Sequence, residues 1–474
     1  MFNSKKIMIL LLLLSFFFES AFSNKSLKFI TIPFKIQKYT YKPDKDGLLK
    51  NYLYKDIFTT ISIGTPSQEI PMLIGFGEYT TYILSNKVLG YDGTAIYNKD
   101  KSSSYKCPQK YSELFFYQIF NEAYRAKENV HLTNPKTTLK NFEFFLATQV
   151  GENICYLPYC EVLTQPGVLG LRMSPSEGLS ESINSTNFIT QLRNKGIIDS
   201  HDFTFLFGDD DNGTLIIGEK PDEYDEENYD KEDFMFTKAY IENSKEKDWS
   251  LNFDNIVYGD KKLINEKSWI MRVEYGLIDG DKRWQKILEE SFFNTNIERG
   301  VCFKGKGWND GHSYYHYYCD KNVDLSNFKP FVFVINDLHY NLTFTKDDLF
   351  KEDGDKILFL MIFGHYSLIL GLPFFKKYQF VFNQGAKTIG LYTKIGGTPS
   401  VPIPLPILDK DTNKSFDIIK YAIILVIGIL AVFFGFRYYE RNCSKKSKTV
   451  FLINRKKKNS KEIQLSDYTQ MTSK

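Results

Sequence analysis

The chain has 474 residues, which is enough for two or three domains with substantial hydrophobic cores. Its 60 basic and 57 acidic residues nearly balance, and a formal net charge of +3 gives no overall electrostatic attraction to nucleic acid. The sequence contains 41 Phe and 31 Tyr residues, and such an aromatic composition favours β-strands over helices.

The amino terminus has the pattern of a secretory signal peptide. Two lysines precede a mostly apolar run over residues 7–18, and Ala21 and Ser23 supply the small side chains of a cleavage site. We therefore predict a signal peptide over residues 1–23. An uncleaved membrane anchor is the less favoured alternative, because the apolar run is short and Glu19 follows it.

The stretch Ile57–Ser85 has the pattern of a β-hairpin followed by a tight turn and another strand. Apolar and polar residues alternate as far as Ile63, and Gly64-Thr65-Pro66 interrupts the alternation with turn residues. The alternation resumes at Ile70 and ends at Gly75-Phe76-Gly77. We expect the first half of the chain to be organised around this hairpin.

This hairpin resembles the hairpin and active-site loop of the pepsin-like aspartic proteases, in which a Gly-Thr-Pro turn precedes an Asp-Thr/Ser-Gly motif. Gln165–Leu171 resembles the glycine-containing strand that passes that loop, and Leu368–Tyr392 resembles the terminal segment of the family. The resemblance spans roughly Asp56–Tyr392. It implies an all-β, bilobal pepsin-like fold with a central cleft, peptide-bond hydrolysis as the family activity, and no cofactor.

The second half repeats the organisation of the first. Each half contains a loop followed, at nearly equal spacing, by a strand of two apolar residues and a glycine. In the first half the two glycines are Gly77 and Gly170, and in the second half they are Gly276 and Gly371. Such repetition predicts two similar lobes.

The two loops expected to carry the catalytic aspartates are altered. In the family, one carboxylate from each lobe shares a proton across a bound water, and a Thr or Ser after each aspartate fixes it by hydrogen bonds. Here Gly75 and Phe76 take the first pair of positions, and Glu274 and Tyr275 align with the second pair. This alignment retains one carboxylate, Glu274, which cannot serve as both acid and base. We therefore predict little or no protease activity.

Other candidate site residues follow from the resemblance. Asp279, followed by Gly280, offers another alignment of the second loop, which is less favoured because it would shift the preceding strand. Tyr124 is a candidate for the flap tyrosine of the family, and an ordinary surface-strand tyrosine is an equally good interpretation. The residues expected to contact a ligand are Phe76, Gly77, Tyr275 and Gly276.

No metal site is predicted. His312 and His316 lie in an aromatic stretch without further ligands at metal-binding spacing. The acidic run 222–233 lacks the spacing of a calcium loop, so a solvated loop is the favoured interpretation over a cation site.

Cysteines and glycosylation sequons agree with a secretory compartment. Cys302 and Cys319 are close in sequence and are predicted to form a disulfide. Cys107, Cys155 and Cys160 are odd in number, so one of them is expected to be unpaired or to bond to another molecule. The predicted glycosylation sites are Asn24, Asn184, Asn212, Asn341 and Asn413.

A second apolar segment, residues 418–439, is long enough to cross a bilayer. Basic residues follow it, and the positive-inside rule places the tail 440–474 in the cytosol. A buried apolar helix is the alternative. Signal and anchor together predict a single-pass type I membrane protein of the secretory pathway, at the cell surface or on an endolysosomal membrane.

Composition and resemblance together divide the chain into parts. Residues 24–51 contain a strand-like alternation and are too short for a full inhibitory prosegment of the family, and the proline-rich residues 396–417 suit a stiff stalk. The predicted parts are a signal peptide (1–23), a short pro-like or N-terminal strand segment (24–51), an N-terminal lobe (52–218), a C-terminal lobe (219–395), a stalk (396–417), a transmembrane helix (418–439) and a basic cytosolic tail (440–474).

Two functions from different classes are compatible with these patterns. The favoured one is a membrane-anchored pseudoprotease that binds an extended peptide or protein in its cleft without cutting it. The alternative is an aspartic endopeptidase that works through an atypical dyad. The altered loops favour the first, because function depends on the site and not on the fold.

Overall fold

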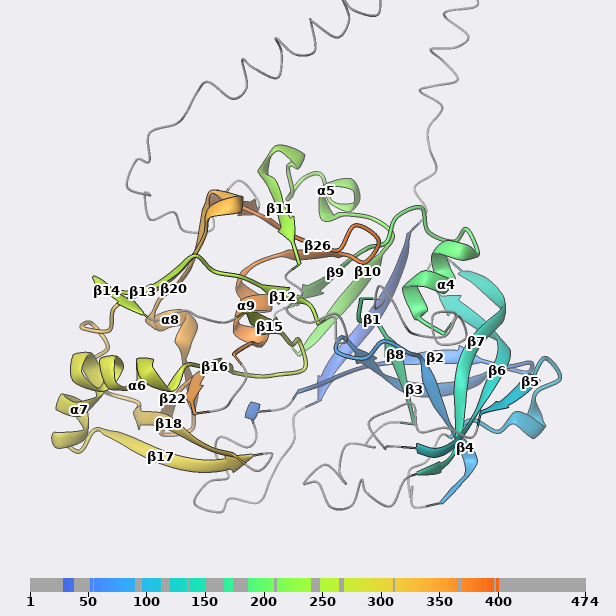
Figure 1. The fold of residues 1–474 in the computed structure, drawn as a ribbon, viewed down its shortest axis with the longest axis horizontal. Coiled ribbons are helices and arrows are strands. Elements are labelled where there is room, and N and C mark those ends of the chain that lie inside the picture. Colours follow the sequence, from blue (N-terminus) through green and yellow to red (C-terminus); the bar gives the residue numbers. More distant parts are fainter. Residues whose placement is uncertain are drawn as a thin grey trace, which may run out of the picture. The chain divides into compact units, whose positions relative to one another are not determined.

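A computed structural model shows that most of the described residues lie in β-strands (Figure 1). This agrees with the predicted all-β class. The described residues are 29–37, 52–53, 55–89, 96–111, 120–133, 136–150, 166–173, 186–208, 211–239, 248–263, 268–309, 312–364, 368–395 and 398–399.

The first half contributes ten strands to one 13-stranded sheet, whose order is β11-β26-β25-β9-β10-β1-β2-β3-β8-β4-β7-β6-β5. β2 also pairs with β6, so this part of the sheet curls back on itself. The elements are β1 (Ile30–Gln37), β2 (Asp56–Ile63), β3 (Gln68–Gly75), β4 (Tyr82–Leu89), η1 (Lys99–Lys101), β5 (Lys106–Tyr111), β6 (Phe120–Thr133), β7 (Lys136–Val150), β8 (Gly167–Gly170), α4 (Phe188–Asn194), β9 (Asp202–Phe207) and β10 (Asn212–Ile217).

The predicted hairpin is confirmed as β2 and β3. They pair antiparallel from Phe58 opposite Leu73 to Ile63 opposite Gln68. Gly64 begins the turn with a φ of 98°, a left-handed conformation that glycine adopts without strain. Alternate side chains of β2 are buried, as the alternation of apolar residues predicts.

β1 is an integral strand of the sheet. It pairs antiparallel with β10 from Ile30 to Lys35 and with β2 from Lys35 to Gln37. The side chains of Ile30, Ile32 and Phe34 are buried. Residues 30–37 therefore form a core strand of the fold, within the segment where the sequence predicts a strand-like alternation.

Three strands from the second half complete the 13-stranded sheet, and most of the others form a nine-stranded and a four-stranded sheet. The elements are α5 (Pro221–Tyr224), η3 (Lys231–Asp233), β11 (Phe234–Lys238), β12 (Ser250–Leu251), β13 (Asn255–Tyr258), β14 (Lys261–Leu263), β15 (Trp269–Met271), β16 (Ile278–Gly280), α6 (Lys282–Leu288), η4 (Glu289–Phe293), α7 (Asn294–Glu298), β17 (Cys302–Asn309), β18 (His312–Asp320), β19 (Phe331–Ile335), η5 (Asn336–Leu338), β20 (Tyr340–Phe344), α8 (Lys346–Leu349), β21 (Phe350–Asp353), β22 (Lys356–Phe359), β23 (Met361–Phe363), β24 (Ile369–Leu370), α9 (Leu372–Lys377), β25 (Phe380–Asn383), β26 (Thr388–Tyr392), β27 (Lys394–Ile395) and β28 (Thr398–Pro399).

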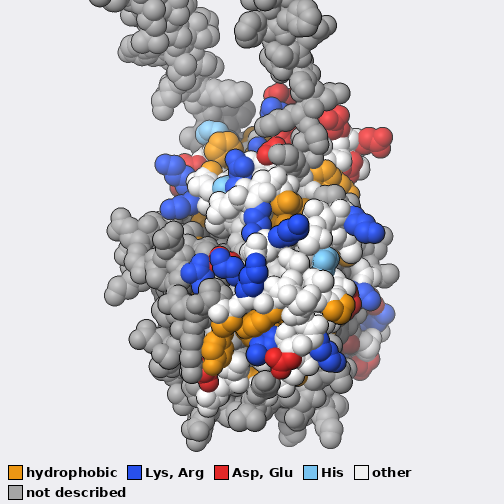
Figure 2. All heavy atoms as spheres, turned by 90° about the vertical axis from the view of Figure 1, so that its right-hand side faces the viewer, with side chains coloured by type: hydrophobic (Ala, Val, Ile, Leu, Met, Phe, Trp, Pro, Cys, Tyr) orange, Lys and Arg blue, Asp and Glu red, His pale blue; other side chains and the backbone are white. Residues whose placement is uncertain are grey.

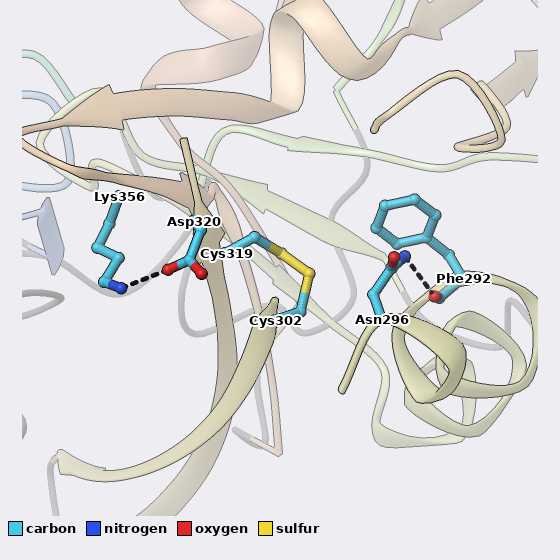
Figure 3. The surroundings of a disulfide bond; sticks show 6 residues. All are labelled: Phe292, Asn296, Cys302, Cys319, Asp320 and Lys356. Atoms are coloured by element: carbon cyan, nitrogen blue, oxygen red, sulfur yellow. Dashed lines mark hydrogen bonds and ion pairs between the residues drawn. A yellow bond between two sulfur atoms is a disulfide. The ribbon is translucent and has the colours of Figure 1, made fainter. Parts of the chain in front are cut away.

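The predicted disulfide is confirmed. Cys302 and Cys319 lie directly opposite each other in the β17–β18 hairpin, and their sulfurs are bonded (Figure 3). The next residue, Asp320, forms an ion pair with Lys356 of β22. The disulfide therefore closes the hairpin where it joins the rest of the nine-stranded sheet. Cys107 is exposed on β5, whereas Cys155 and Cys160 lie outside the described residues.

Several predictions concern segments outside the described residues. The signal peptide, the stalk, the segment 418–439 and the tail are among them, as are the sequons at Asn24, Asn184 and Asn413. Within the described part of the chain, no helix is both long and apolar enough to cross a membrane. Of the two described sequons, Asn212 is exposed, whereas Asn341 is half-buried with its Oδ1 shielded from solvent.

Candidate functional site

The first candidate loop begins where β3 ends. Gly75 lies opposite Gly170 in the parallel pairing of β3 with β8, and its carbonyl accepts hydrogen bonds from Leu171 N at 3.0 Å and Glu78 N at 3.1 Å. A Cβ at position 75 would lie 2.5 Å from Val168 Cγ1 and 2.8 Å from Glu78 Cβ. The surrounding side chains are thus packed closely around a glycine.

Phe76 points into the core. It is fully buried, and its ring centroid lies 4.9 Å from that of Phe382, 5.5 Å from that of Phe375 and 6.2 Å from that of Trp249. All three neighbours belong to the second half, so Phe76 packs the first loop against an aromatic core to which both halves contribute. It is therefore not available to contact a ligand, contrary to its predicted role.

The second candidate loop begins where β15 ends. β15 pairs parallel with β24, with Met271 opposite Leu370, and the next pair in this register is Arg272 and Gly371. Arg272 N donates to Leu370 O at 3.0 Å, which continues the pairing. Arg272 therefore lies opposite Gly371 in the second half of the chain, as Gly75 lies opposite Gly170 in the first half.

The hydrogen bond that closes the turn in each loop gives the same correspondence. Glu78 N donates to Gly75 O at 3.1 Å, and Tyr275 N donates to Arg272 O at 3.2 Å, so each loop turns by the same three-residue step. Glu78 of the first loop therefore corresponds to Tyr275 of the second loop.

The strands that leave the two loops also correspond. Tyr82 of β4 lies opposite Val168, and Asp279 of β16 lies opposite Ile369. In both halves the partner residue lies two positions before the strand glycine, as Val168 does before Gly170 and Ile369 before Gly371. The strand residue lies seven positions after the start of the loop, as Tyr82 does after Gly75 and Asp279 after Arg272. Asp279 is thus a fully buried strand residue, and burial raises its pKa well above the usual range. The alternative alignment through Asp279 is wrong.

The sequence alignment of the second loop therefore needs correction by two residues. Arg272, and not Glu274, corresponds to Gly75, and Glu274 corresponds to Gly77. The sequence alone favours Gly276 as the loop glycine because position 274, two residues after Arg272, holds a glutamate. The signal that identifies Arg272 is the apolar pair Ile270-Met271 directly before it, which matches Leu73-Ile74 before Gly75.

The side chain of Arg272 reaches across to the first loop. A Cβ on Gly77 would lie 1.6 Å from Arg272 Nη1, 2.7 Å from its Cζ and 3.1 Å from Glu274 Oε1. The guanidinium group therefore lies directly against the Gly77 backbone. Only a residue without a side chain permits this approach.

An ion-pair cluster joins the two halves at this point. Asp248 Oδ1 lies 3.1 Å from Arg272 Nη2 and 3.1 Å from Arg172 Nε, so one carboxylate bridges guanidinium groups from both halves. Arg272 Nη1 also lies 3.7 Å from Glu274 Oε1. Because these side chains are largely buried, the pairs are screened less than surface pairs.

Two glutamates of this region are easier to protonate than usual. Burial raises the pKa of Glu78 to about 7, although the nearby Arg272 and Arg172 act in the opposite direction. Burial also raises the pKa of Glu274, whose Oε2 is shielded and has no hydrogen-bond partner. The cluster can therefore change its charge near neutral pH.

The second loop is covered by the segment that precedes β2. Lys55 N donates to Glu274 O at 2.9 Å, and Gly276 N donates to Leu53 O at 2.9 Å. A Cβ on Gly276 would lie 1.9 Å from Tyr52 O, so close backbone packing requires glycine there. Tyr275 is only 4% exposed and is not open to a ligand, whereas Gly276 lines a pocket together with Tyr52 and Lys55.

The remaining candidates lie elsewhere. Tyr124 is in the middle of β6, opposite Lys110 of β5 and Leu146 of β7, and its hydroxyl donates to Glu122 Oε1 at 2.6 Å. His316 is buried in β18. Within the described residues no group of three or more His, Cys, Asp or Glu side chains could hold a metal ion.

Comparison with known families agrees with the two-loop architecture. The family model of eukaryotic aspartyl proteases matches residues 56–394, which is most of the chain. No curated protein sequence matches this chain significantly. The matched range includes both loops, the strands that pass them and the terminal segment.

Proposed function

Because the chain belongs to the eukaryotic aspartyl protease family, we propose that it is a member without catalytic activity, which binds an extended peptide or protein segment and does not cut it. One observation carries the proposal: the strand registers give Gly75 and Arg272 corresponding positions at the start of the two loops. If Gly75 stands at the first aspartate position, Arg272 stands at the second.

This pair of residues cannot perform the family reaction. The reaction needs two carboxylates that share one proton and hold a water between them. Gly75 supplies no functional group, and the Arg272 guanidinium is a permanent cation that donates hydrogen bonds and accepts none. The protein therefore lacks a general base at both positions.

The nearby carboxylates are poor substitutes. Glu274 follows Arg272 by two residues and is held beside its guanidinium, at 3.7 Å. Glu78 follows Gly75 by three residues, at the turn of the first loop. A displacement of about 1 Å from a productive geometry already costs roughly a hundredfold in rate. An atypical dyad of Glu78 and Glu274 is thus the less favoured function.

Localisation forms a second part of the proposal. The predicted signal peptide 1–23 and the apolar segment 418–439 support a type I membrane protein whose protease-like domain faces the lumen or the cell exterior. Alkaline carbonate extraction and protease protection of intact vesicles test this arrangement. Release of the protein by carbonate, or digestion of the domain and protection of the tail when protease is added to intact vesicles, would contradict it.

The test of inactivity uses the full-length chain in detergent with labelled denatured casein, from acidic to neutral pH. We expect no cleavage products by mass spectrometry, while pepsin in the same assay produces them at acidic pH. Casein cleavage that is blocked by a transition-state inhibitor of aspartic proteases, and lost in both Glu78→Gln and Glu274→Gln, would establish the atypical dyad instead.

Binding is tested separately with fluorescently labelled peptides that pepsin releases from casein. Saturable binding of an intact peptide, measured by fluorescence anisotropy, is the expected result. The matched pair of variants is Gly77→Ala, which displaces Arg272 from the first loop, and Gly208→Ala, whose Cβ would have no atom closer than 3.4 Å. Only the first should weaken binding.

A further inference from the structure

β11 forms one edge of the 13-stranded sheet. Among the described strands it pairs only with β26, from Phe234 opposite Tyr392 to Lys238 opposite Thr388. Figure 1 shows this short strand beside α5, in light green. The edge lies far along the sheet from β3 and β8, so it is separate from the candidate site.

Hydrogen bonds at both ends of β11 show which backbone groups face outward. Thr393 N donates to Asp233 O at 2.9 Å, and Ala239 N donates to Lys387 O at 2.9 Å. Because bonded and non-bonded pairs alternate in an antiparallel ladder, Phe236 turns its N–H and C=O away from β26. Outward backbone groups on an edge strand can pair with a strand from another chain.

The same edge carries exposed aromatic side chains. Phe236 is 62% exposed and Tyr224 is 45% exposed, and they are the exposed large hydrophobic residues of the described part of the chain. The ring of Phe236 stacks on that of Phe234 at 6.3 Å. An apolar contact for an incoming side chain thus lies next to the outward N–H and C=O of Phe236, while the neighbouring Thr237 hydroxyl bonds to Asp337 of η5 at 3.5 Å.

The surroundings of the edge are strongly acidic. Residues 222–233 contain eight acidic residues and one basic residue, although the whole chain has a net charge of +3. Figure 2 shows acidic side chains gathered at the upper end of the face it draws, with Lys and Arg side chains prevailing below. The exposed acids of this run are Glu223, Glu226, Glu227, Asp230 and Glu232.

Other charged groups only partly neutralise the acidic run. Asp233 pairs with Lys394 at 2.9 Å, and Asp222 accepts a hydrogen bond from the Tyr392 hydroxyl. Lys220 lies over the Phe234 ring, 4.8 Å from its centroid. The exposed acids therefore leave a net negative potential beside the edge, which favours a basic partner.

We propose that β11 is a docking edge for an extended, basic segment of a partner protein. The segment adds as a strand beside Phe236, one of its apolar side chains packs on the Phe236 ring, and its Lys or Arg side chains lie over the acidic run 222–233. This function is independent of the loop site and goes beyond ligand binding there.

A protective role for the acids predicts a different surface. Proteins often guard edge strands with charged side chains that point outward and keep other strands away. Such protection does not expose an aromatic ring at the centre of the edge, as Phe236 does. Lys238 at the end of β11 suits either role, so the variants below concentrate on Phe236 and the acidic run.

The probe is a fluorescein-labelled peptide of alternating lysine and valine, added to the full-length chain in detergent. We expect saturable binding by anisotropy that weakens as salt is raised. Phe236→Pro removes the outward N–H without removing a bond to β26, and should weaken binding about tenfold. Phe236→Ala keeps the N–H and should weaken it less.

The contribution of the acidic run is tested with the triple variant Glu226→Gln, Glu227→Gln and Asp230→Asn. It should reduce both the affinity and its salt dependence. Circular dichroism confirms that each variant is folded, and if Phe236→Pro does not fold, Phe236→Ala and the triple variant decide. Equal binding of a glutamate–valine peptide, or unchanged binding in the folded variants, would overturn the proposal.

Discussion

The first and second loops begin at corresponding residues of two similar strand arrangements, yet their side chains are opposite in kind. Gly75 has no side chain and is enclosed by Val168 and Glu78, whereas Arg272 carries a long cation that reaches Gly77 of the other loop. The two loops therefore depend on each other. The guanidinium fits only because the first loop presents glycine backbone, and this explains why neither loop can be interpreted alone.

The largest effect is expected for Gly77→Ala. The new Cβ would overlap the Arg272 guanidinium and displace it from Asp248, so we expect a loss of about 3 kcal/mol of unfolding free energy. Urea unfolding followed by tryptophan fluorescence measures it. In an Arg272→Ala background the same substitution should cost almost nothing. An equal cost in both backgrounds would show that the loops do not depend on each other.

Asp248→Asn should have the next largest effect. It removes the carboxylate that lies 3.1 Å from both Arg172 and Arg272, and leaves two guanidinium groups with weaker partners. We expect about 2 kcal/mol of destabilisation, below the cost for a fully buried pair because these side chains retain some exposure. The same unfolding measurement applies. A cost no larger than that of Asp100→Asn on the exposed surface would contradict the bridging role.

Glu78 makes the stability contribution of the first loop dependent on pH. Its pKa is about 7 in the folded protein, above the ordinary value of 4.5, so the folded state holds a proton that the unfolded state releases. Its contribution to stability is full below about pH 4.5 and is lost as the pH rises to about 7. Glu78→Gln should therefore stabilise the protein at pH 8 by about 1 to 2 kcal/mol and have little effect at pH 4. A variant whose stability follows the parent at every pH would refute this assignment.

Arg272→Lys should have the smallest effect and is the most specific probe of the second loop. Lysine keeps the charge, but its single ammonium cannot contact Asp248 and Glu274 together as the planar guanidinium does. We expect a loss of about 1 kcal/mol. Thermal unfolding can detect it, with Arg283→Lys at the exposed end of α6 as the matched control. A larger loss in the control would contradict the special role of the guanidinium.

The sequence allowed most of the fold and part of the site to be predicted. Gly64-Thr65-Pro66 identified the β2–β3 hairpin, and Cys302 and Cys319 identified a disulfide, because each depends on residues close in sequence. Arg272 was missed because the apolar pair Ile270-Met271 before it is a weak signal by itself, and the pairing with β24 that settles its position involves residues almost a hundred positions later. Local patterns do not specify such a register once the loop glycine is lost.

The ion-pair cluster could not have been predicted. Arg172 and Asp248 lie far apart in the chain and have no shared motif, and they meet only because β8 and the segment before β12 converge on the loops. The roles expected for Phe76 and Tyr275 were wrong for a related reason. Sequence indicates that a residue lies in a loop, but only packing shows that its ring turns into the core.

The position of β1 limits how the chain can be processed at its amino terminus. Cleavage after Ser23 would leave all of β1 in place, but trimming beyond Ile30 would remove a strand that bonds to β10 on one side and to β2 on the other. Each of those strands would then expose an unpaired edge inside the sheet. An amino-terminal cleavage that leaves this sheet intact therefore has to lie before Ile30, and cleavage further along the chain would disrupt the pairing of β10 and β2 with β1.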